Sequence, residues 1–145
     1  MIVEDFSPLE SFCKWIENFE IPIILALKAT TSEKMVAASH LCLAAENAKI
    51  GKYFAEEALK LGLINKIVSL EELENETFAL AEKISRLAPL AIRACLKAVN
   101  QGSQIPLNEG LGLESELFSQ IFSTADMREG TRAFLEKRQP VFRGK

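Results

Sequence analysis

The second half of this 145-residue sequence consists of helical patterns that follow one another with little between them. From Ser69 onward, apolar side chains recur at spacings of three and four, which is the repeat of one face of an α-helix. Four helices are expected: the first begins at a capping box of Ser69 and Glu72, the second at Pro89, the third at Leu107, and the last at Asp126 as N-cap. This pattern requires a helix-rich fold in which each helix has one covered face.

The apolar faces of these helices are larger than the short first half can cover. Phe134 is expected to be the main apolar anchor of the last helix, and Phe118 and Phe122 form an i,i+4 pair on the helix before it. We therefore expect part of this surface to be buried against another subunit. The other apolar positions of the pattern are Leu70, Leu73, Thr77, Leu80, Ile84, Leu87, Leu90, Ala94, Cys95, Ala98, Val99, Leu111, Leu117, Ile121 and Ala125.

The first half alternates short extended and helical segments. A helix is expected over Pro8 to Phe19, and short apolar runs predict buried strands near residues 21–27, 41–45 and 63–68. Between the strands, the expected helices span 31–39 and 53–61, the second of them ended by Gly62. The fold class is therefore α/β and helix-rich. We expect a single domain, 1–145, in which a β/α core over 1–68 precedes a helical oligomerisation region over 69–145.

Composition excludes several classes of protein. Cys13, Cys42 and Cys95 form no CxxC pair and are expected to be small buried hydrophobes in a reducing cytoplasm. His40 is the only histidine, so no zinc site is expected, and a structural or surface role is favoured for it. The longest apolar run, 21–27, is far shorter than the roughly 20 residues that a membrane span needs.

Charge is distributed unevenly along the chain. The whole sequence carries −3, which argues against nucleic acid as a partner, whereas residues 126–145 hold six Lys and Arg against three acidic residues. This basic segment could attract a small anion such as a nucleotide phosphate. The alternative is an ordinary solvated basic helix.

Two longer motifs resemble a known family. One motif, from Ala55 to Val68 (AEEALKLGLINKIV), is similar to the segment that completes the core in the enoyl-CoA hydratase/isomerase (crotonase) superfamily. The other, from Asp126 to Phe142 (DMREGTRAFLEKRQPVF), is similar to the last helix of that superfamily. Ile21 to Ala26 and Leu41 to Gly51 resemble the strands that flank the active-site helix of that family. Pro89 to Ile92 with Lys97, then Glu114 to Phe122, fit the helices between the two motifs. The chain is therefore identified as a shortened, degenerate member of this superfamily, which implies a connection to acyl-CoA and fatty acid metabolism.

The resemblance also implies a catalytic apparatus that this sequence lacks. The family uses two backbone N–H groups as an oxyanion hole, one of them in a glycine stretch at a helix start, and many hydratases add two glutamates. Here Ala29 to Met35 (ATTSEKM) replaces the glycine stretch, and no glycine occurs before Gly51. Only Lys52 to Phe54 separate Gly51 from Ala55, and the strands expected before Phe6 are absent. We therefore predict no catalytic residues and no hydratase activity.

Other carboxylates are weak substitutes for the missing acids. Glu33 and Glu46 lie near the relevant region, and Glu56 and Glu57 begin a helix. Carboxylates in a first turn usually complement the helix dipole, and Glu46 is expected to be a solvated strand end.

Two positions match residues with which the family contacts coenzyme A. Phe118 aligns with an aromatic residue that packs on the adenine, and Lys137 with a lysine near the nucleotide phosphates. The alternatives are a core aromatic pair and ordinary surface charge. The resemblance implies a coenzyme A thioester as ligand, no other cofactor or metal, and assembly as a homotrimer, a homohexamer or a complex with a full-length paralogue. We expect an oligomerising or acyl-CoA-binding subunit; the alternatives are an enzyme with a rebuilt site and a scaffold without a ligand.

Overall fold

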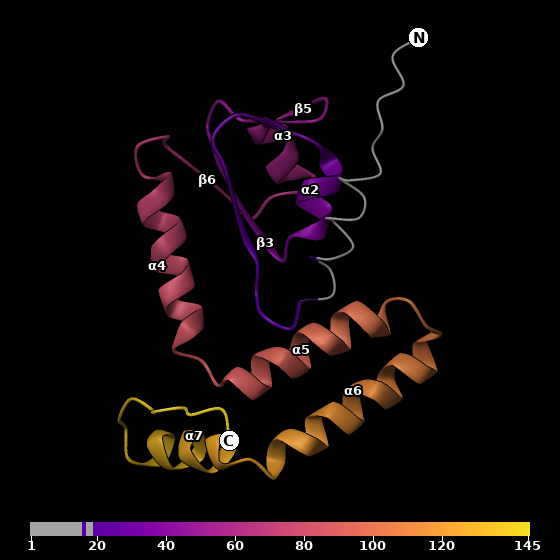
Figure 1. Cartoon of the computed structure of the whole chain (residues 1–145), viewed down its shortest axis with the longest axis vertical. Coiled ribbons are helices and arrows are strands. Elements are labelled where there is room, and N and C mark those ends of the chain that lie inside the picture. The colour runs from indigo at the N-terminus through magenta and orange to yellow at the C-terminus, as the bar shows by residue number, and fades with distance from the viewer. Residues whose placement is uncertain (1–15, 17–18) are drawn as a thin grey trace. The chain divides into compact units, whose positions relative to one another are not determined.

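The computed structural model describes Ile16 and residues 19–145 (Figure 1). The chain divides into two compact units, residues 1–81 and 82–145. The helix expected over Pro8 to Phe19 lies outside the described residues, except for Ile16, which is buried, and Phe19.

The first unit is built on a three-stranded parallel sheet with the order β1-β3-β6. These strands are β1 (Ile24–Leu27), β3 (Leu41–Ala45) and β6 (Lys66–Val68), so all three predicted strands are present with shorter bounds. The central strand β3 is buried from its second residue to its last, because it is paired on both edges and covered on both faces. Helices α2 (Glu33–Ala38) and α3 (Ala55–Lys60) lie in the two connections between these strands.

A second sheet consists of three two-residue strands that sequence patterns cannot detect. These are β2 (Thr30–Thr31), β4 (Lys49–Ile50) and β5 (Tyr53–Phe54), paired in the order β2-β4-β5. Strand β5 pairs antiparallel with β4, so the helix expected from Tyr53 begins only at Ala55. Gly62 ends that helix as expected, in the left-handed region with φ 73°.

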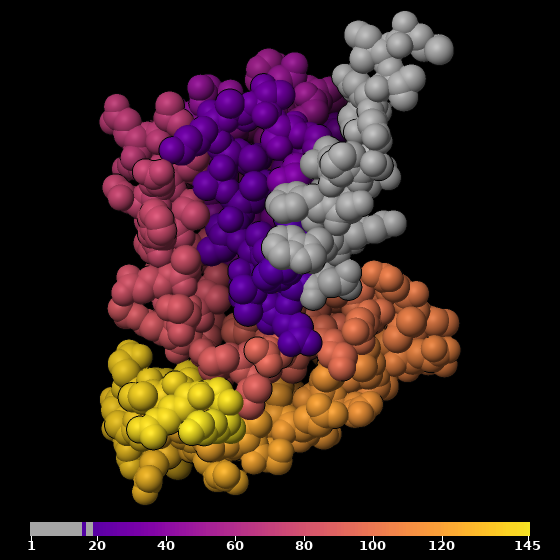
Figure 2. Space-filling view, in the orientation of Figure 1, coloured from indigo at the N-terminus to yellow at the C-terminus, as the bar shows by residue number. Residues whose placement is uncertain are grey.

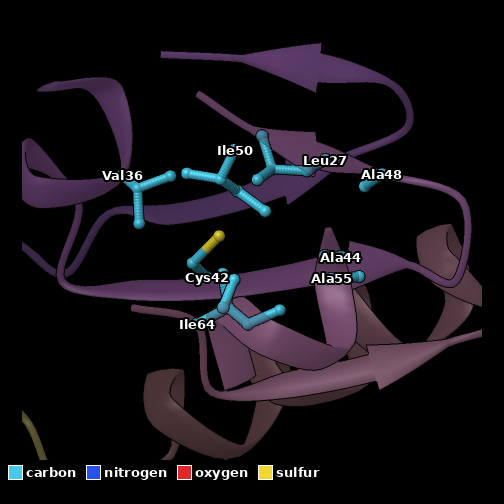
Figure 3. Close-up of a cluster of buried hydrophobic side chains, with 9 residues drawn as sticks. Leu27, Val36, Cys42, Ala44, Ala48, Ile50, Ala55 and Ile64 are labelled. Carbon is cyan, nitrogen blue, oxygen red and sulfur yellow. The ribbon is translucent and has the colours of Figure 1, made fainter. Parts of the chain in front are cut away.

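The core of the first unit lies between the two sheets and the two short helices (Figure 3). Cys42 points its sulfur into this cluster and is 2% exposed, as predicted for a small buried hydrophobe. The other buried members are Leu27, Val36, Ala44, Ala48, Ile50, Ala55, Ala58 and Ile64. A second cluster on the other face of β3 consists of Leu43, Ala45, Val68 and Leu73.

Four helices make up the rest of the chain, as predicted. They are α4 (Leu73–Ser85), α5 (Pro89–Gly102), α6 (Leu107–Phe122) and α7 (Ala125–Leu135). The capping box before α4 is present, since Ser69 Oγ accepts a hydrogen bond from the Glu72 amide at 3.3 Å and donates one to Glu72 Oε2 at 2.9 Å. The boundary between the two units falls within α4.

The prediction for the start of α7 was wrong by two residues. Thr124 is the N-cap, and its hydroxyl accepts a hydrogen bond from the Met127 amide at 3.1 Å. Asp126 lies inside the first turn and is 3% exposed. Phe134, the expected apolar anchor, is 82% exposed, because the covered face of α7 carries the small residues Gly130 and Ala133 instead.

Little of the apolar surface in the second unit is covered. Helix α5 has no buried residue, and Leu117 is the only buried residue of α6. Cys95 is exposed, so its prediction as a buried hydrophobe was wrong. The sequence pattern correctly indicated apolar helix faces, but the residues that the structure describes leave these faces largely exposed. Within the part of the chain that the structure describes, no helix has the length and apolarity needed to cross a membrane.

Candidate functional site

Helix α2 is the region that the family resemblance places at the active site. Ser32 caps this helix, and its hydroxyl accepts a hydrogen bond from the Met35 amide at 3.4 Å. One first-turn amide of this helix, that of Met35, is thus bound inside the chain. Residues 29–35 carry a Cβ at every position, which keeps any substrate further from the backbone than a glycine stretch would.

The turn at Gly51 is also closed by contacts within the chain. Gly51 has φ 54°, a conformation that favours glycine, and its amide donates to the Thr31 carbonyl oxygen at 2.8 Å. The Glu33 carboxylate lies directly against its α-carbon, so a Cβ added there would collide with that group. The space beside this turn is therefore taken by a side chain of the same protein.

The remaining carboxylates do not converge on a reaction site. Glu46 is exposed just after β3, where its amide donates to the Val68 carbonyl oxygen at 3.1 Å. Glu56 and Glu57 are exposed in the first turn of α3, the position in which they complement the helix dipole. These placements agree with the structural roles expected from the sequence.

His40 has a structural role. Its Nδ1 accepts a hydrogen bond from the Ile23 amide at 3.0 Å, so that nitrogen carries no proton in this arrangement. Burial lowers the pKa of the imidazole below its usual 6.5. His40 therefore ties the segment before β1 to the segment before β3 in its neutral form.

The described residues contain no cluster of three His, Cys, Asp or Glu side chains that could hold a metal ion. Burial raises the pKa of the Cys42 thiol to about 11, which keeps it protonated and unreactive.

Phe118 lies on a groove between α5 and α6. Figure 1 shows the two helices diverging from the loop that joins them, and near that loop the backbones of Gly102 and Gly110 are in close contact. The groove has a volume of about 340 Å³. The ring of Phe118 is 62% exposed and packs edge-on against Phe122 with ring centroids 4.9 Å apart. The residues that line the groove are Ala94, Cys95, Ala98, Val99, Gly102, Leu107, Gly110, Leu111, Glu114, Leu117, Phe118 and Ile121.

Lys137 lies at the end of α7 in an unusual backbone conformation. Its φ of 52° is in the left-handed region, and it closes a Schellman motif. The Lys137 amide donates to the Phe134 carbonyl oxygen at 3.2 Å, and the Arg138 amide donates to that of Ala133 at 3.0 Å. The lysine side chain is exposed, so its charge is available to a ligand. Lys137 does not line the groove that contains Phe118.

Residues 138–145, here named the C-terminal strap, fold back along α7. Figure 2 shows the last residues, in yellow, against one side of this helix. The carboxylate of Asp126 accepts hydrogen bonds from the amides of Arg143 and Gly144 at 2.7 and 2.8 Å. The Lys145 carbonyl oxygen accepts hydrogen bonds from the amides of Ala125 and Asp126. Sequence analysis missed this role of Asp126, because its partners are backbone amides far along the chain.

Glu129 provides the second attachment of the strap. Its carboxylate forms a paired interaction with the Arg138 guanidinium at 2.6 and 3.0 Å and accepts a hydrogen bond from the Val141 amide at 2.9 Å. The hydrogen bond from Arg138, followed by that from Val141, lowers the pKa of Glu129 to about 2. Two of the charges in the basic C-terminal segment thus neutralise each other.

Comparison with known proteins identifies the family. The enoyl-CoA hydratase/isomerase family model matches residues 31–145. The chain belongs to this family, which is the superfamily that the motifs at 55–68 and 126–142 indicated.

The curated relatives are longer proteins. The short-chain-enoyl-CoA hydratase of Clostridium acetobutylicum is 40% identical over 105 residues, which are 72% of this chain and 38% of that protein. The probable mitochondrial enoyl-CoA hydratase of Dictyostelium discoideum is 41% identical over 91 residues, 63% of this chain and 33% of that protein. The chain thus spans about a third of the length of these relatives.

The fold likewise matches solved structures. An enoyl-CoA hydratase from Bacillus anthracis superposes with a TM-score of 0.92 at 24% identity, over 100% of this chain and 72% of that one. An enoyl-CoA hydratase subunit I from Geobacillus kaustophilus gives a TM-score of 0.85 at 27% identity, again over 100% of this chain and 72% of that one. The superposition includes residues 21–30, which precede the range that the family model matches.

Proposed function

We propose that this protein is a non-hydrating member of the enoyl-CoA hydratase/isomerase family that assembles through its C-terminal helices or binds a coenzyme A thioester. One observation carries the proposal. In the segment Ala29 to Met35, which stands where the family has the glycine stretch of its oxyanion hole, every residue carries a Cβ and the Met35 amide is bound to the Ser32 hydroxyl inside the chain.

The lack of hydration follows from what the reaction needs. An oxyanion hole requires two N–H donors that converge on one point, with an acid or base nearby to handle the water. The Glu33 carboxylate lies against Gly51, where a negative charge would repel an enolate. Purified protein is therefore expected to give no hydration of a short enoyl-CoA, and turnover that persists after removal of contaminating full-length hydratase would overturn this part.

Coenzyme A binding is proposed at Phe118 and Lys137. An aromatic ring that is 62% exposed can stack on adenine, and an exposed lysine in a segment of net charge +3 can attract phosphates. Isothermal titration calorimetry with coenzyme A is expected to show weaker binding for Lys137→Ala. Lys60→Ala serves as a matched control, since it removes an exposed lysine from the end of a helix in the first unit. Equal affinities for the two variants would refute the phosphate contact.

Assembly is proposed for residues 69–145, as a homotrimer, a homohexamer or a complex with a full-length paralogue. The amphipathic helix α5 has no buried side chain and α6 has only Leu117, so both helices leave apolar surface for a partner. Light scattering is expected to show a species larger than 16.1 kDa, and a clean monomer would contradict assembly with itself. We place the protein in the cytoplasm, because Cys42 and Cys95 are free thiols.

The competing proposal is an active enzyme with a rebuilt site that hydrates, isomerises or decarboxylates an acyl-CoA. It is favoured by the names of the relatives, which include short-chain-enoyl-CoA hydratases at 40% identity. The hydration assay above distinguishes the two.

A further inference from the structure

Lys137 lies between two residues whose side chains are bonded to each other. Glu136 precedes it and Arg138 follows it, and Arg138 Nε donates a hydrogen bond to Glu136 Oε2 at 2.6 Å. The same guanidinium donates to both carboxylate oxygens of Glu129, at 2.6 and 3.0 Å. We name Glu129, Glu136 and Arg138 the Arg138 clasp. The clasp ties the residues on either side of Lys137 to a carboxylate within helix α7.

The backbone at Lys137 needs such support. Its φ of 52° is unfavourable for an L-residue such as lysine. The two backbone hydrogen bonds of the Schellman motif hold this conformation, but they lie at the end of α7, where helices fray. The clasp adds side-chain bonds that are partly shielded from water, since the side chains of Glu129 and Arg138 are 24% and 38% exposed. We therefore expect the turn to lose order when the clasp is removed.

The clasp also determines which positive charge is left for a ligand. The charge of Arg138 is neutralised by Glu129 and Glu136. The Nε of Arg132 lies 3.3 Å from the other oxygen of the Glu136 carboxylate. Lys137 has no carboxylate partner in the part of the chain that the structure describes, and its side chain is exposed. An anion that approaches the end of α7 therefore finds an unpaired positive charge at Lys137.

We propose that Glu129 is a positioning residue for the coenzyme A phosphates. Through Arg138 it holds the turn in which Lys137 meets the ligand, and it keeps Arg138 itself out of that contact. Glu129 touches no ligand in this arrangement. The inference rests on the phosphate contact of Lys137 in the proposed function, and it adds a residue within α7 that determines the strength of that contact.

A charge-neutral double substitution removes the clasp. Glu129→Gln/Arg138→Gln deletes one negative and one positive charge, so the net charge of the chain is unchanged. Isothermal titration calorimetry with coenzyme A at low ionic strength, where exposed charges are least screened, is expected to show the same loss of affinity as for Lys137→Ala, about 1.4- to 5-fold. Glu82→Gln/Arg86→Gln is the matched control, because it removes an ion pair of 2.6 Å between exposed side chains at the end of α4. The control should bind coenzyme A like the wild type.

The triple variant Glu129→Gln/Arg138→Gln/Lys137→Ala distinguishes positioning from a separate contribution to binding. If Glu129 acts through Lys137, the triple variant should bind coenzyme A no more weakly than Lys137→Ala. The double variant, the triple variant and Lys137→Ala should also share the same reduced dependence of affinity on salt. General destabilisation of the fold would not change that salt dependence.

Two results would overturn the positioning role while leaving the Lys137 contact standing. One is wild-type affinity in the double variant when Lys137→Ala binds more weakly, and the other is a further loss of affinity in the triple variant. Unchanged affinity in Lys137→Ala would instead refute the phosphate contact and the positioning role together. Circular dichroism of each variant verifies that it is folded.

Discussion

Lys137 offers a test in which stability and binding are expected to change in opposite directions. The residue has φ 52°, and the left-handed conformation costs an L-residue about 1–2 kcal/mol. Glycine avoids this cost but loses about 0.5–1 kcal/mol through the greater freedom of the unfolded chain. Lys137→Gly is therefore expected to raise the free energy of unfolding by about 0.5–1 kcal/mol. The backbone hydrogen bonds of the Schellman motif remain, since both donors are main-chain amides.

The same substitution removes the charge that we propose for the nucleotide phosphates. An exposed ion pair contributes about 0.2–1 kcal/mol, so coenzyme A affinity should fall by about 1.4- to 5-fold. Urea denaturation followed by circular dichroism measures the first effect, and isothermal titration calorimetry measures the second. A lower unfolding free energy for Lys137→Gly would refute the argument from backbone strain. Unchanged affinity would refute the phosphate contact. Lys137→Asn, which also tolerates the left-handed region, separates loss of charge from gain of flexibility.

Three further perturbations follow from the contacts described above. His40→Ala should lower the unfolding free energy by about 1 kcal/mol, because the Ile23 amide loses its hydrogen-bond acceptor. The wild type should also lose stability as the pH falls below about 6.5, because the folded state disfavours protonated His40, and His40→Ala should not show this loss. Asp126→Ala should cost about 2–3 kcal/mol in a urea titration, since two strap amides lose a buried carboxylate, whereas Asp126→Asn should cost less. The ionised Glu129 carboxylate should stabilise the fold above about pH 4.5, and this contribution to the unfolding free energy should be lost as the pH falls from about 4.5 to about 2. Glu129→Gln should lack the contribution at every pH. Identical pH profiles of stability for the wild type and Glu129→Gln would contradict this prediction.

The features of the fold that local chemistry determines could be predicted from the sequence. The proline at Pro89 and the glycine at Gly62 mark helix ends where the sequence placed them. The capping-box hydrogen bonds of Ser69 and Glu72 also form, but helix α4 begins only at Leu73. Apolar runs likewise located β1, β3 and β6, because a buried parallel strand needs a continuous apolar segment.

The features that were missed depend on partners distant in sequence. Asp126 is a residue type that often caps helices, but its carboxylate accepts hydrogen bonds from the amides of residues 143 and 144. Thr124 caps the helix instead. Phe134 fits an apolar helical pattern, yet the side of α7 that the strap covers requires small residues. Periodicity indicates which face of a helix is apolar, but whether this chain or another covers it depends on tertiary contacts.

Only part of the candidate site could be predicted from the sequence. Replacement of a glycine stretch by Ala29 to Met35 is visible in the sequence, whereas the contact of Glu33 with Gly51 depends on the turn that brings β4 back beside β2. The placement of Phe118 on a groove and Lys137 at a left-handed helix end could be found only from the structure.

We propose that this protein retains the fold of an enoyl-CoA hydratase without its hydration chemistry. Hydration of a short enoyl-CoA can be measured fraction by fraction across the gel-filtration peak of the purified protein. No fraction is expected to show turnover that follows the protein concentration. Activity that rises and falls with the protein across the peak would contradict it.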